Sequence, residues 1–365
     1  MKVVVVRAFP DPYRMSMERY ANDVVRRVGR IMDVGESIDS VAMPTPRLRS
    51  GPGRYWDQYV RYERYAREHA GDVNHIVDNG YGHLTSSLPP WRTVVTFHDA
   101  VVSKLPGVGW RTRLAFRYSL RAMRRAAAII CASETSRRDL LELIRVPEER
   151  LFVIPVGIHE DFRPAPDRDA VRRRLNLSGP VVLMVGHTQT YMNVERMLRA
   201  FAALVTTRQV PARLVKIGTP FTPAQVQLLS DLGISDRVEV VGRVAFTDLA
   251  AYFQAADVLF YAPRLAGFGL PPLEAMACGT PVVCSDRGAV PEVVGDAALM
   301  VDADDEGALA GALMTALTDA VKRRRLIEAG FGRASRFEWT ESARRFLDVY
   351  RAVARSAGSR APNVG

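Results

Sequence analysis

The sequence has few cysteines, few lysines and no long apolar run. Its three cysteines, Cys131, Cys278 and Cys284, stand at unrelated spacings that fit neither a disulfide framework nor a zinc site. No stretch of about 18 apolar residues is present, so a membrane-spanning helix is not expected. The opening run, residues 1–7, is too short for a signal peptide and predicts a buried strand. We therefore expect a reduced, cytoplasmic protein.

The composition is that of a globular protein. The chain has 365 residues, of which 48% are hydrophobic and 25% charged, and at about 150 residues per domain this length predicts two domains. The net charge is +10. No zinc finger, RNA-recognition motif or basic zipper accompanies this charge, so we expect no nucleic-acid partner.

The most basic stretch is residues 111–125, where six arginines alternate with apolar side chains as in an amphipathic helix. A solvated helix face is the ordinary interpretation. Two others stay open, which are peripheral contact with an anionic membrane at its inner face and binding of a phosphorylated ligand.

Short β-branched runs alternate with amphipathic segments along the whole chain, which predicts βαβ units and parallel sheets. The expected strands are Val3–Val6, Asn74–Val77, Thr93–Phe97, Ala128–Cys131, Phe152–Ile154, Val181–Val185, Arg213–Ile217, Val238–Val241, Val258–Tyr261, Pro281–Cys284 and Ala298–Val301. Their nearly unbroken apolar character indicates sheets covered on both faces. We expect an α/β fold of two doubly wound, Rossmann-like domains facing across a cleft, the default place for a ligand.

Turn residues and two prolines in Val156–Pro166 mark the expected domain boundary. Residues 1–160 then form the first domain and residues 165–338 the second. A last helix, at about residues 339–355, follows the second unit without a strand of its own, and we expect it to return to the first domain. Residues 356–365 read as a frayed tail. A homodimer is left open.

One segment carries recognisable chemistry. After the predicted strand Val258–Tyr261, Gly267 and Gly269 allow a tight turn before a helix expected from Leu273. A glycine loop at a helix N-terminus suits a diphosphate. Glu274 is then expected in the first helical turn, where its carboxylate would accept hydrogen bonds from a ribose diol. The alternative is a tight turn followed by a capping glutamate.

The segment Ala266–Val283 strongly resembles the nucleotide-binding signature of family 4 of the retaining glycosyltransferases, which have the GT-B fold. Other segments resemble this family in the same order along the chain. They are Ser16–Ala21, Thr96–Asp99, Ser133–Leu140, Ile154–Ile158, Val185–Gly186, Asn193–Arg196, Val241–Val244 and Pro291–Ala298. The resemblance therefore covers most of the chain.

The resemblance implies a role for each matching residue. Glu274 would hold the nucleotide ribose, Gly186 would allow close approach of the diphosphate, and His98 would lie near the donor sugar, unless it is a strand-end histidine bonded to backbone. The remaining donor-side residues are Gly242, Arg243, Val244, Gly267, Phe268, Gly269 and Leu270. Arg14 and Ser16 are expected on the acceptor side. No metal and no further cofactor are implied, and the acidic run Asp302–Asp305 is expected to be a solvated loop.

Three positions depart from the family pattern. Ala266 replaces the first Glu of its Glu-x7-Glu motif, Met192 the usual Lys, and His187 an Arg. The Lys and Arg normally stabilise the leaving diphosphate, and losing such a stabiliser costs roughly 100-fold or more in rate. Arg264 and His187 are the first candidates to replace them. Arg7, Arg14 and Lys216 stay open as further candidates.

The resulting expectation is a retaining, metal-independent glycosyltransferase that uses a nucleotide-sugar donor, such as a deoxysugar lacking the hydroxyl that Glu would bind. Its acceptor, a small molecule or a lipid-linked one, cannot be read from the variable loops. Two alternatives stay open, which are an enzyme that couples a nucleotide-activated cyclitol through a non-glycosidic bond, and a non-catalytic nucleotide-sugar-binding partner of an active enzyme.

Overall fold

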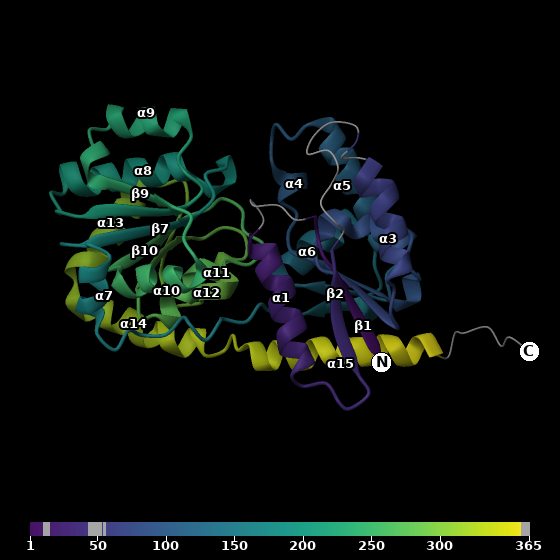
Figure 1. Cartoon of the computed structure of the whole chain (residues 1–365). Coiled ribbons are helices and arrows are strands. Elements are labelled where there is room, and N and C mark those ends of the chain that lie inside the picture. Colours follow the sequence, from purple (N-terminus) through teal and green to yellow (C-terminus); the bar gives the residue numbers. More distant parts are fainter. Residues whose placement is uncertain (10–14, 43–52, 54–55, 359–365) are drawn as a thin grey trace, which may run out of the picture. The chain divides into compact units, whose positions relative to one another are not determined.

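The computed structural model describes residues 1–9, 15–42, 53 and 56–358. These residues form two compact units. One consists of Met1–Gly157 together with the chain from Trp339 onward, and the other of Ile158–Glu338. Each unit is built around one six-stranded sheet in which every strand pair is parallel (Figure 1). The predicted α/β fold with two parallel sheets is confirmed.

The first unit has the strand order β2-β1-β3-β4-β5-β6. Its strands are β1 (Lys2–Val6), β2 (Ser37–Val41), β3 (Val73–Ile76), β4 (Thr93–Phe97), β5 (Ala128–Cys131) and β6 (Leu151–Val153). Its α-helices are α1 (Met15–Gly29), α3 (Tyr62–Glu68), α4 (Val101–Lys104), α5 (Trp110–Met123), α6 (Glu134–Leu143) and α15 (Trp339–Gly358). A π-helical turn, η1 (Asp57–Arg61), and the 3₁₀ turns η2 (Asn79–Ser86), η3 (Pro90–Arg92) and η4 (Glu148–Arg150) complete it.

The second unit has the order β12-β11-β10-β7-β8-β9. Its strands are β7 (Val181–Gly186), β8 (Arg213–Gly218), β9 (Val238–Gly242), β10 (Val258–Tyr261), β11 (Val282–Ser285) and β12 (Leu299–Val301). Its α-helices are α7 (Arg168–Arg174), α8 (Val194–Ala202), α9 (Pro223–Asp231), α10 (Phe246–Ala255), α11 (Leu270–Ala277), α12 (Val290–Val294), α13 (Glu306–Thr318) and α14 (Ala320–Ala334). The short turns are η5 (Thr190–Met192), η6 (Ala203–Thr207) and η7 (Ser235–Arg237).

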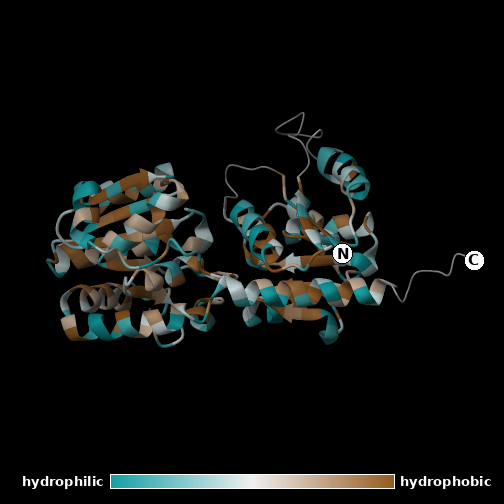
Figure 2. Ribbon diagram, turned by 60° about the horizontal axis from the view of Figure 1, so that its bottom comes forward, coloured by the Kyte–Doolittle hydropathy of each residue, from teal (hydrophilic) through white to brown (hydrophobic). Residues whose placement is uncertain are grey.

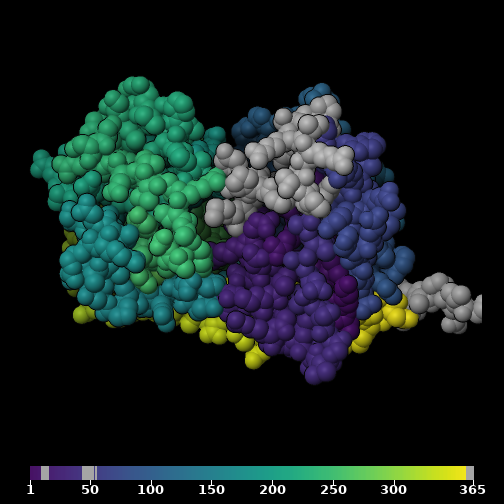
Figure 3. Space-filling model, viewed as in Figure 1, coloured from purple at the N-terminus to yellow at the C-terminus, as the bar shows by residue number. Residues whose placement is uncertain are grey.

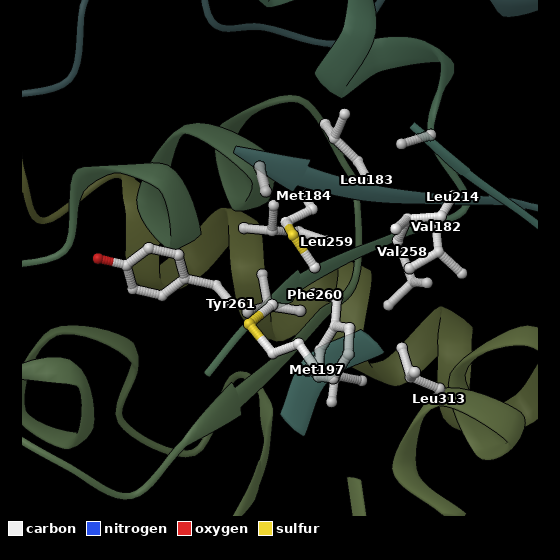
Figure 4. Packing of buried hydrophobic residues seen from close by; sticks show 14 of the residues in the cluster. Val182, Leu183, Met184, Met197, Leu214, Val258, Leu259, Phe260, Tyr261 and Leu313 are labelled. Carbon is white, nitrogen blue, oxygen red and sulfur yellow. The ribbon is translucent and has the colours of Figure 1, made fainter. Parts of the chain in front are cut away.

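The central strands of both sheets are buried on both faces, as their apolar runs predict. All four residues of β5 and all four of β10 are buried. In the second unit, side chains of β7, β8 and β10 pack with Met197 of α8 and Leu313 of α13 (Figure 4). Apolar colour accordingly concentrates along the strands in Figure 2. Burial of this kind gives a rigid sheet whose strand ends can hold a site in place.

Three details differ from the sequence prediction. The edge strand β2 was not predicted, because only Ile38 and Val41 interrupt its polar side chains. The last helix continues to Gly358, so that residues 356–358, expected to be frayed, are helical. The helix after the glycine loop begins at Leu270 rather than at Leu273.

The last helix packs on the first unit, against α1 (Figures 1 and 3). A buried polar network joins it to the sheet. The Tyr350 hydroxyl lies 2.6 Å from Nδ1 of His75, whose Nε2 lies 2.7 Å from Oγ1 of Thr96. Thr96 in turn contacts the Tyr20 hydroxyl of α1 at 3.1 Å. Burial, together with the nearby charge of His98, lowers the pKa of His75 to about 3.

This network predicts acid-sensitive folding. Between pH 6.5, the ordinary pKa of histidine, and about 3, the unfolded chain binds a proton at His75 that the folded chain excludes. The contribution of neutral His75 to the free energy of unfolding is therefore complete above pH 6.5. It decreases as the pH falls, by up to about 1.4 kcal/mol per pH unit. His83, whose burial lowers its pKa to about 4, adds an effect of the same sign.

The measurement is the free energy of unfolding in urea, followed by circular dichroism across this pH range, for the wild type and for His75→Gln. Glutamine keeps a hydrogen-bonding side chain but does not titrate. We expect a shallower pH slope in the variant, and equal slopes would show that His75 is not a source of the acid sensitivity.

Candidate functional site

The strand order of the second unit places a candidate site at the carboxyl ends of its strands. Successive strands run outward from β7 through β8 to β9, and then from β10 on the other side of β7. The order therefore reverses between β7 and β10, and in doubly wound sheets ligands bind outside the carboxyl ends of the strands at such a reversal. The segments that follow these two strands are Gly186–Asn193 and Ala262–Gly269. Both contain residues that the sequence singled out.

Glycines end β7 and β8 side by side. Gly186 pairs with Gly218, and both have a positive φ, of 127° and 108°. A Cβ at Gly218 would lie 2.5 Å from the carbonyl oxygen of Gly186. That oxygen also accepts the backbone N–H of Thr219 at 3.2 Å. The two strand ends are therefore held close together, and only glycine fits at position 218.

Lys216 lies behind this pair of glycines. Its side chain is buried, with 1% exposure. Its Nζ donates to the carbonyl oxygen of Gly186 at 2.6 Å and to that of Ile217 at 2.8 Å. Burial lowers the pKa of Lys216 to about 8. From the sequence, Lys216 is one of several basic residues that could replace the missing cation. The signal that could have distinguished it is the presence of a lysine within an apolar strand.

His187 follows Gly186 and is half-buried. Its Nδ1 lies 3.2 Å from Oγ1 of Thr219. Burial is the main cause that lowers its pKa, and the positive charges of Lys216 and Arg243 lower it further. Arg243 is exposed and follows Gly242, the last residue of β9, whose φ is 79°. The structure thus brings the predicted residues Gly186, His187, Gly242 and Arg243 together, with Val244 next in the chain.

The loop after β10 is held by its backbone. Nδ2 of Asn193 donates to the carbonyl oxygens of Ala262 at 3.2 Å and of Ala303 at 2.7 Å. Oγ of Ser285 donates to that of Pro263 at 2.6 Å, and the N–H of Ala289 to that of Ala266 at 2.9 Å. Asn193 itself adopts the left-handed conformation, with φ of 59°. Asn193 belongs to the segment Asn193–Arg196, which resembles the family. The sequence does not indicate its partners, because they lie 69 and 110 residues away along the chain.

The predicted glycine loop leads directly into α11. Gly269, with φ of 104°, is the N-cap, and Leu270 is the first helical residue. Pro271 and Pro272 follow, and since proline has no N–H they reduce the donors available to an anion at this helix start. The N–H groups nearest the helix start are then those of Phe268, Gly269 and Leu270. The Phe268 ring packs edge-on against Phe337 at 5.9 Å.

Glu274 lies in the second turn of α11, so the prediction of a first-turn position is wrong. The reason is that the two prolines begin the helix rather than precede it, as proline does at a helix start. The side chain is buried, with 3% exposure. Burial raises the pKa values of Tyr261 and Cys278, and the charge of Glu274 raises both further. A glutamate in the second turn does not cap the helix, which removes the capping interpretation.

Arg264, the first candidate for a replacement cation, is bound to an acidic loop. Its Nη2 lies 2.9 Å from Oδ1 of Asp304, which also pairs with Arg196 at 3.2 Å. Arg287 pairs with Asp302 at 2.9 Å. The acidic run after β12 is therefore exposed and paired with arginines, and Asp305 at its end caps α13 through the N–H of Ala308. In this arrangement the charge of Arg264 is balanced by Asp304.

His98 lies in the first unit, after β4. Its Nε2 contacts the carbonyl oxygen of Val77 at 2.7 Å, and Tyr20 lies edge-on to its ring at 4.9 Å. A carbonyl only accepts, so Nε2 carries the proton, and in the neutral ring Nδ1 is the acceptor that can face a ligand. The backbone N–H of His98 donates to Oδ1 of Asn79 at 3.2 Å, and Oγ of Ser136 donates to its carbonyl oxygen at 2.7 Å. The expected arrangement, in which the ring is bonded to backbone, is thus present at Nε2.

The other first-unit candidates are less informative. Ser16 is exposed in the first turn of α1, and Arg14 lies outside the described residues. Arg7 pairs with Glu18 at 3.0 Å and donates to Asn22 at 2.6 Å. Among the residues that the structure describes, no cluster of three metal-ligating side chains forms, and no helix is long and apolar enough to cross a membrane.

Two family models match almost the whole chain. Residues 4–162 match the model "Glycosyltransferase Family 4", and residues 167–333 match "Glycosyl transferases group 1". A curated relative, the MMP alpha-(1->4)-mannosyltransferase of Mycolicibacterium hassiacum, is 30% identical over 94% of this chain and 86% of its own length.

Solved structures show the same fold. Sucrose-phosphate synthase from Thermosynechococcus elongatus superposes with a TM-score of 0.81 at 22% identity, over 97% of this chain and 99% of its own. HepE from Anabaena, solved in complex with UDP and glucose, gives 0.77 at 17% identity, over 96% of this chain and 100% of its own. The protein has the GT-B fold of glycosyltransferases. The chain belongs to the group 1 glycosyltransferases, also described as family 4.

The close contact at Gly218 predicts a severe effect of Gly218→Ala. The new Cβ would meet backbone rather than a flexible side chain, and the positive φ adds strain. We expect a loss of about 3 kcal/mol in the free energy of unfolding. Gly233→Ala is the matched control, since Gly233 has φ of 65° but nothing within 4 Å, and it should cost only about 1 kcal/mol. Equal losses in urea unfolding would show that Gly218 contributes no close approach.

Proposed function

We propose that this protein transfers a sugar from a nucleoside-diphosphate sugar to an acceptor hydroxyl, with retention and without a metal. The single observation that carries the proposal is at the carboxyl ends of the second sheet's strands, where Gly186 ends β7, the Gly267–Gly269 loop follows β10 and the buried Glu274 lies in the next helix. Family membership and the fold shared with a UDP complex support a nucleotide-sugar donor.

In the proposed step, the bond between the anomeric carbon and the diphosphate oxygen breaks, and its electron pair leaves with the diphosphate. The acceptor oxygen forms the new bond on the same face of the sugar, and its proton passes to the departing diphosphate. Negative charge grows on the diphosphate in the transition state, so positive charge beside it accelerates the step.

Each residue contributes to this step in the way its position allows. The N–H groups of Phe268–Leu270 would bind the diphosphate, Glu274 the ribose, and the Gly242–Val244 segment would border the base. Nδ1 of His98 would accept a hydrogen bond from a sugar hydroxyl. Ala266 has no carboxylate to offer a donor hydroxyl, which favours a donor that lacks that hydroxyl.

The ribose role of Glu274 predicts a loss of nucleotide affinity in Glu274→Gln. The amide keeps the size of the side chain but loses the charge that strengthens hydrogen bonds to the diol. We expect calorimetry with UDP and GDP to show a loss of about 10- to 100-fold for whichever nucleotide binds the wild type.

Two controls make the Glu274 result specific. The unfolding temperature of the variant should stay close to that of the wild type. The 2′,3′-dideoxy form of the same nucleotide should bind wild type and variant equally, since it lacks the diol. Unchanged affinity for the normal nucleotide would show that Glu274 does not bind the ribose.

Turnover separates an enzyme from a non-catalytic relative. We expect the wild type to release nucleotide from at least one sugar donor in a panel, faster when an acceptor is supplied. Binding without any release across the panel would favour the non-catalytic alternative.

We further propose that α5 contacts an anionic membrane. At about 100° per residue, its four arginines and the exposed Trp110, Leu114 and Tyr118 fall within one arc of roughly 160°. Phe116, Leu120 and Met123 lie on the opposite, buried side. No acidic residue occurs between positions 110 and 125. Exposed aromatic side chains among arginines are typical of helices that lie in the headgroup region of a bilayer.

Binding to vesicles tests the α5 surface. The double variant Arg117→Glu/Arg121→Glu should bind vesicles of equimolar phosphatidylcholine and phosphatidylglycerol at least about 30-fold more weakly than the wild type, at about 1 kcal/mol per arginine. Arg324→Glu/Arg325→Glu, which makes the same change in charge on exposed residues of α14, is the control. Equal losses in both variants would show that net charge, not α5, governs binding. Wild-type protein that does not bind these vesicles would refute the contact.

A further inference from the structure

The segment after β7 lacks a cation at the position where the family pattern has lysine. Met192 stands there, and its side chain is buried with 9% exposure. Its Cε lies 3.3 Å from the point that a Cβ on Gly186 would occupy. A thioether at this place packs against the Gly186 turn and brings no charge to it.

A cation does reach the same glycine from the neighbouring strand. The Lys216 ammonium, on β8, lies 2.6 Å from the carbonyl oxygen of Gly186. An ammonium has three donors, and two of those of Lys216 bond to backbone within the described chain, to Gly186 and Ile217. One of its three hydrogens takes no part in these two bonds.

The backbone alone does not explain this buried charge. The carbonyl of Gly186 already accepts the N–H of Thr219 at 3.2 Å, so a lysine is not required to satisfy it. Burying an ammonium costs several kcal/mol unless it is well compensated. Two neutral carbonyls are modest compensation, whereas an anion at the strand end would compensate the charge fully.

The field of this charge extends to the ligand side of the turn. His187, the next residue after Gly186, has its pKa lowered by the charge of Lys216 as well as by burial. The other charge acting on His187 comes from Arg243 after β9, and it is also positive. Both charges that lower the pKa of His187 are therefore positive, and positive charge attracts a diphosphate.

We propose that Lys216 supplies, from β8, the positive charge for the donor diphosphate at the Gly186 turn, where Met192 supplies none. This inference rests on the proposed nucleotide-sugar function and deepens it. In this arrangement the charge comes from the strand adjacent to β7 and not from the segment that follows β7. Lys216 then stabilises the departing diphosphate in the transition state.

Moving the charge back tests the proposal. Calorimetry with UDP and GDP would compare the wild type with Lys216→Met, with Lys216→Met/Met192→Lys, and with Lys322→Met as a matched control on exposed α14. For the nucleotide that binds, Lys216→Met should lose about 10- to 100-fold in affinity. The charge-relocated double variant should recover most of this loss, and Lys322→Met should lose nothing.

A purely structural role of Lys216 gives a different pattern. The corresponding nucleoside, uridine or guanosine, has no phosphate, so its affinity should be the same in wild type and Lys216→Met. A variant that loses the nucleoside as well as the nucleotide has lost the shape of its site, and that result would overturn the proposal.

A pH series needs no disruptive variant. Since the pKa of Lys216 is about 8 in the free protein, affinity of the wild type for the nucleotide should fall as the pH rises from about 7 to above 9. His187, the other titratable group at this turn, has its pKa lowered by burial and by the charges of Lys216 and Arg243, so it is neutral throughout this range. Lys216→Arg, which keeps its charge, should remove the fall.

The outcomes are distinct. A wild type that binds neither nucleotide refutes the proposed function and this inference with it. A wild type that binds, together with Lys216→Met within about threefold of its affinity or a flat pH profile, refutes only the role of Lys216.

Discussion

The contact between the last residues of β7 and β8 determines how the proposed donor site is built. Gly218 allows the Gly186 carbonyl to approach within a distance that no Cβ would permit, and that carbonyl then bonds both Thr219 and Lys216. A bulkier residue at 218 would separate the strand ends, displace His187 and withdraw the ammonium. The position of the Lys216 charge therefore depends on the backbone pairing of Gly186 with Gly218.

The loop after β10, on the other side of the strand-order reversal, is also held in place through its backbone. Its carbonyl groups are bonded to Asn193, Ser285 and Ala289, which come from separate segments of the chain. Such bonding leaves the loop's shape to its neighbours rather than to its own side chains. The loop can then present N–H groups to a ligand in a fixed arrangement, which is the preorganisation that binding an anion requires.

Much of the fold follows from local patterns. Uninterrupted runs such as Val3–Val6 and Val258–Tyr261 can only be buried strands, and the parallel sheets follow from the helices between them. β2 was not predicted, because an edge strand can fold with only a weak pattern of apolar residues on one face. The start of α11 was not predicted because Pro271 and Pro272 resemble a turn, although proline also suits the first turn of a helix.

The candidate site was predictable in its backbone and less so in its charges. Glycines indicate turns because they adopt a positive φ without strain. The partner of a charged side chain depends instead on strand register, which the local sequence does not give. Arg264 reads as a free cation until Asp304, 40 residues away, is placed beside it. Lys216 reads as a buried strand residue until the pairing of Gly186 with Gly218 shows which carbonyl it reaches.

The charges of the second unit are sorted along the carboxyl edge of its sheet. On the β12 side, Asp302 and Asp304 pair with Arg196, Arg264 and Arg287, so that opposite charges compensate one another. At the ends of β7 to β9, both charges that act on His187 are positive. A diphosphate drawn to this edge would therefore be favoured at the β7–β9 side and screened by carboxylates at the other. An arginine-rich chain needs such sorting, because abundant positive charge specifies a binding place only where acidic partners neutralise it elsewhere.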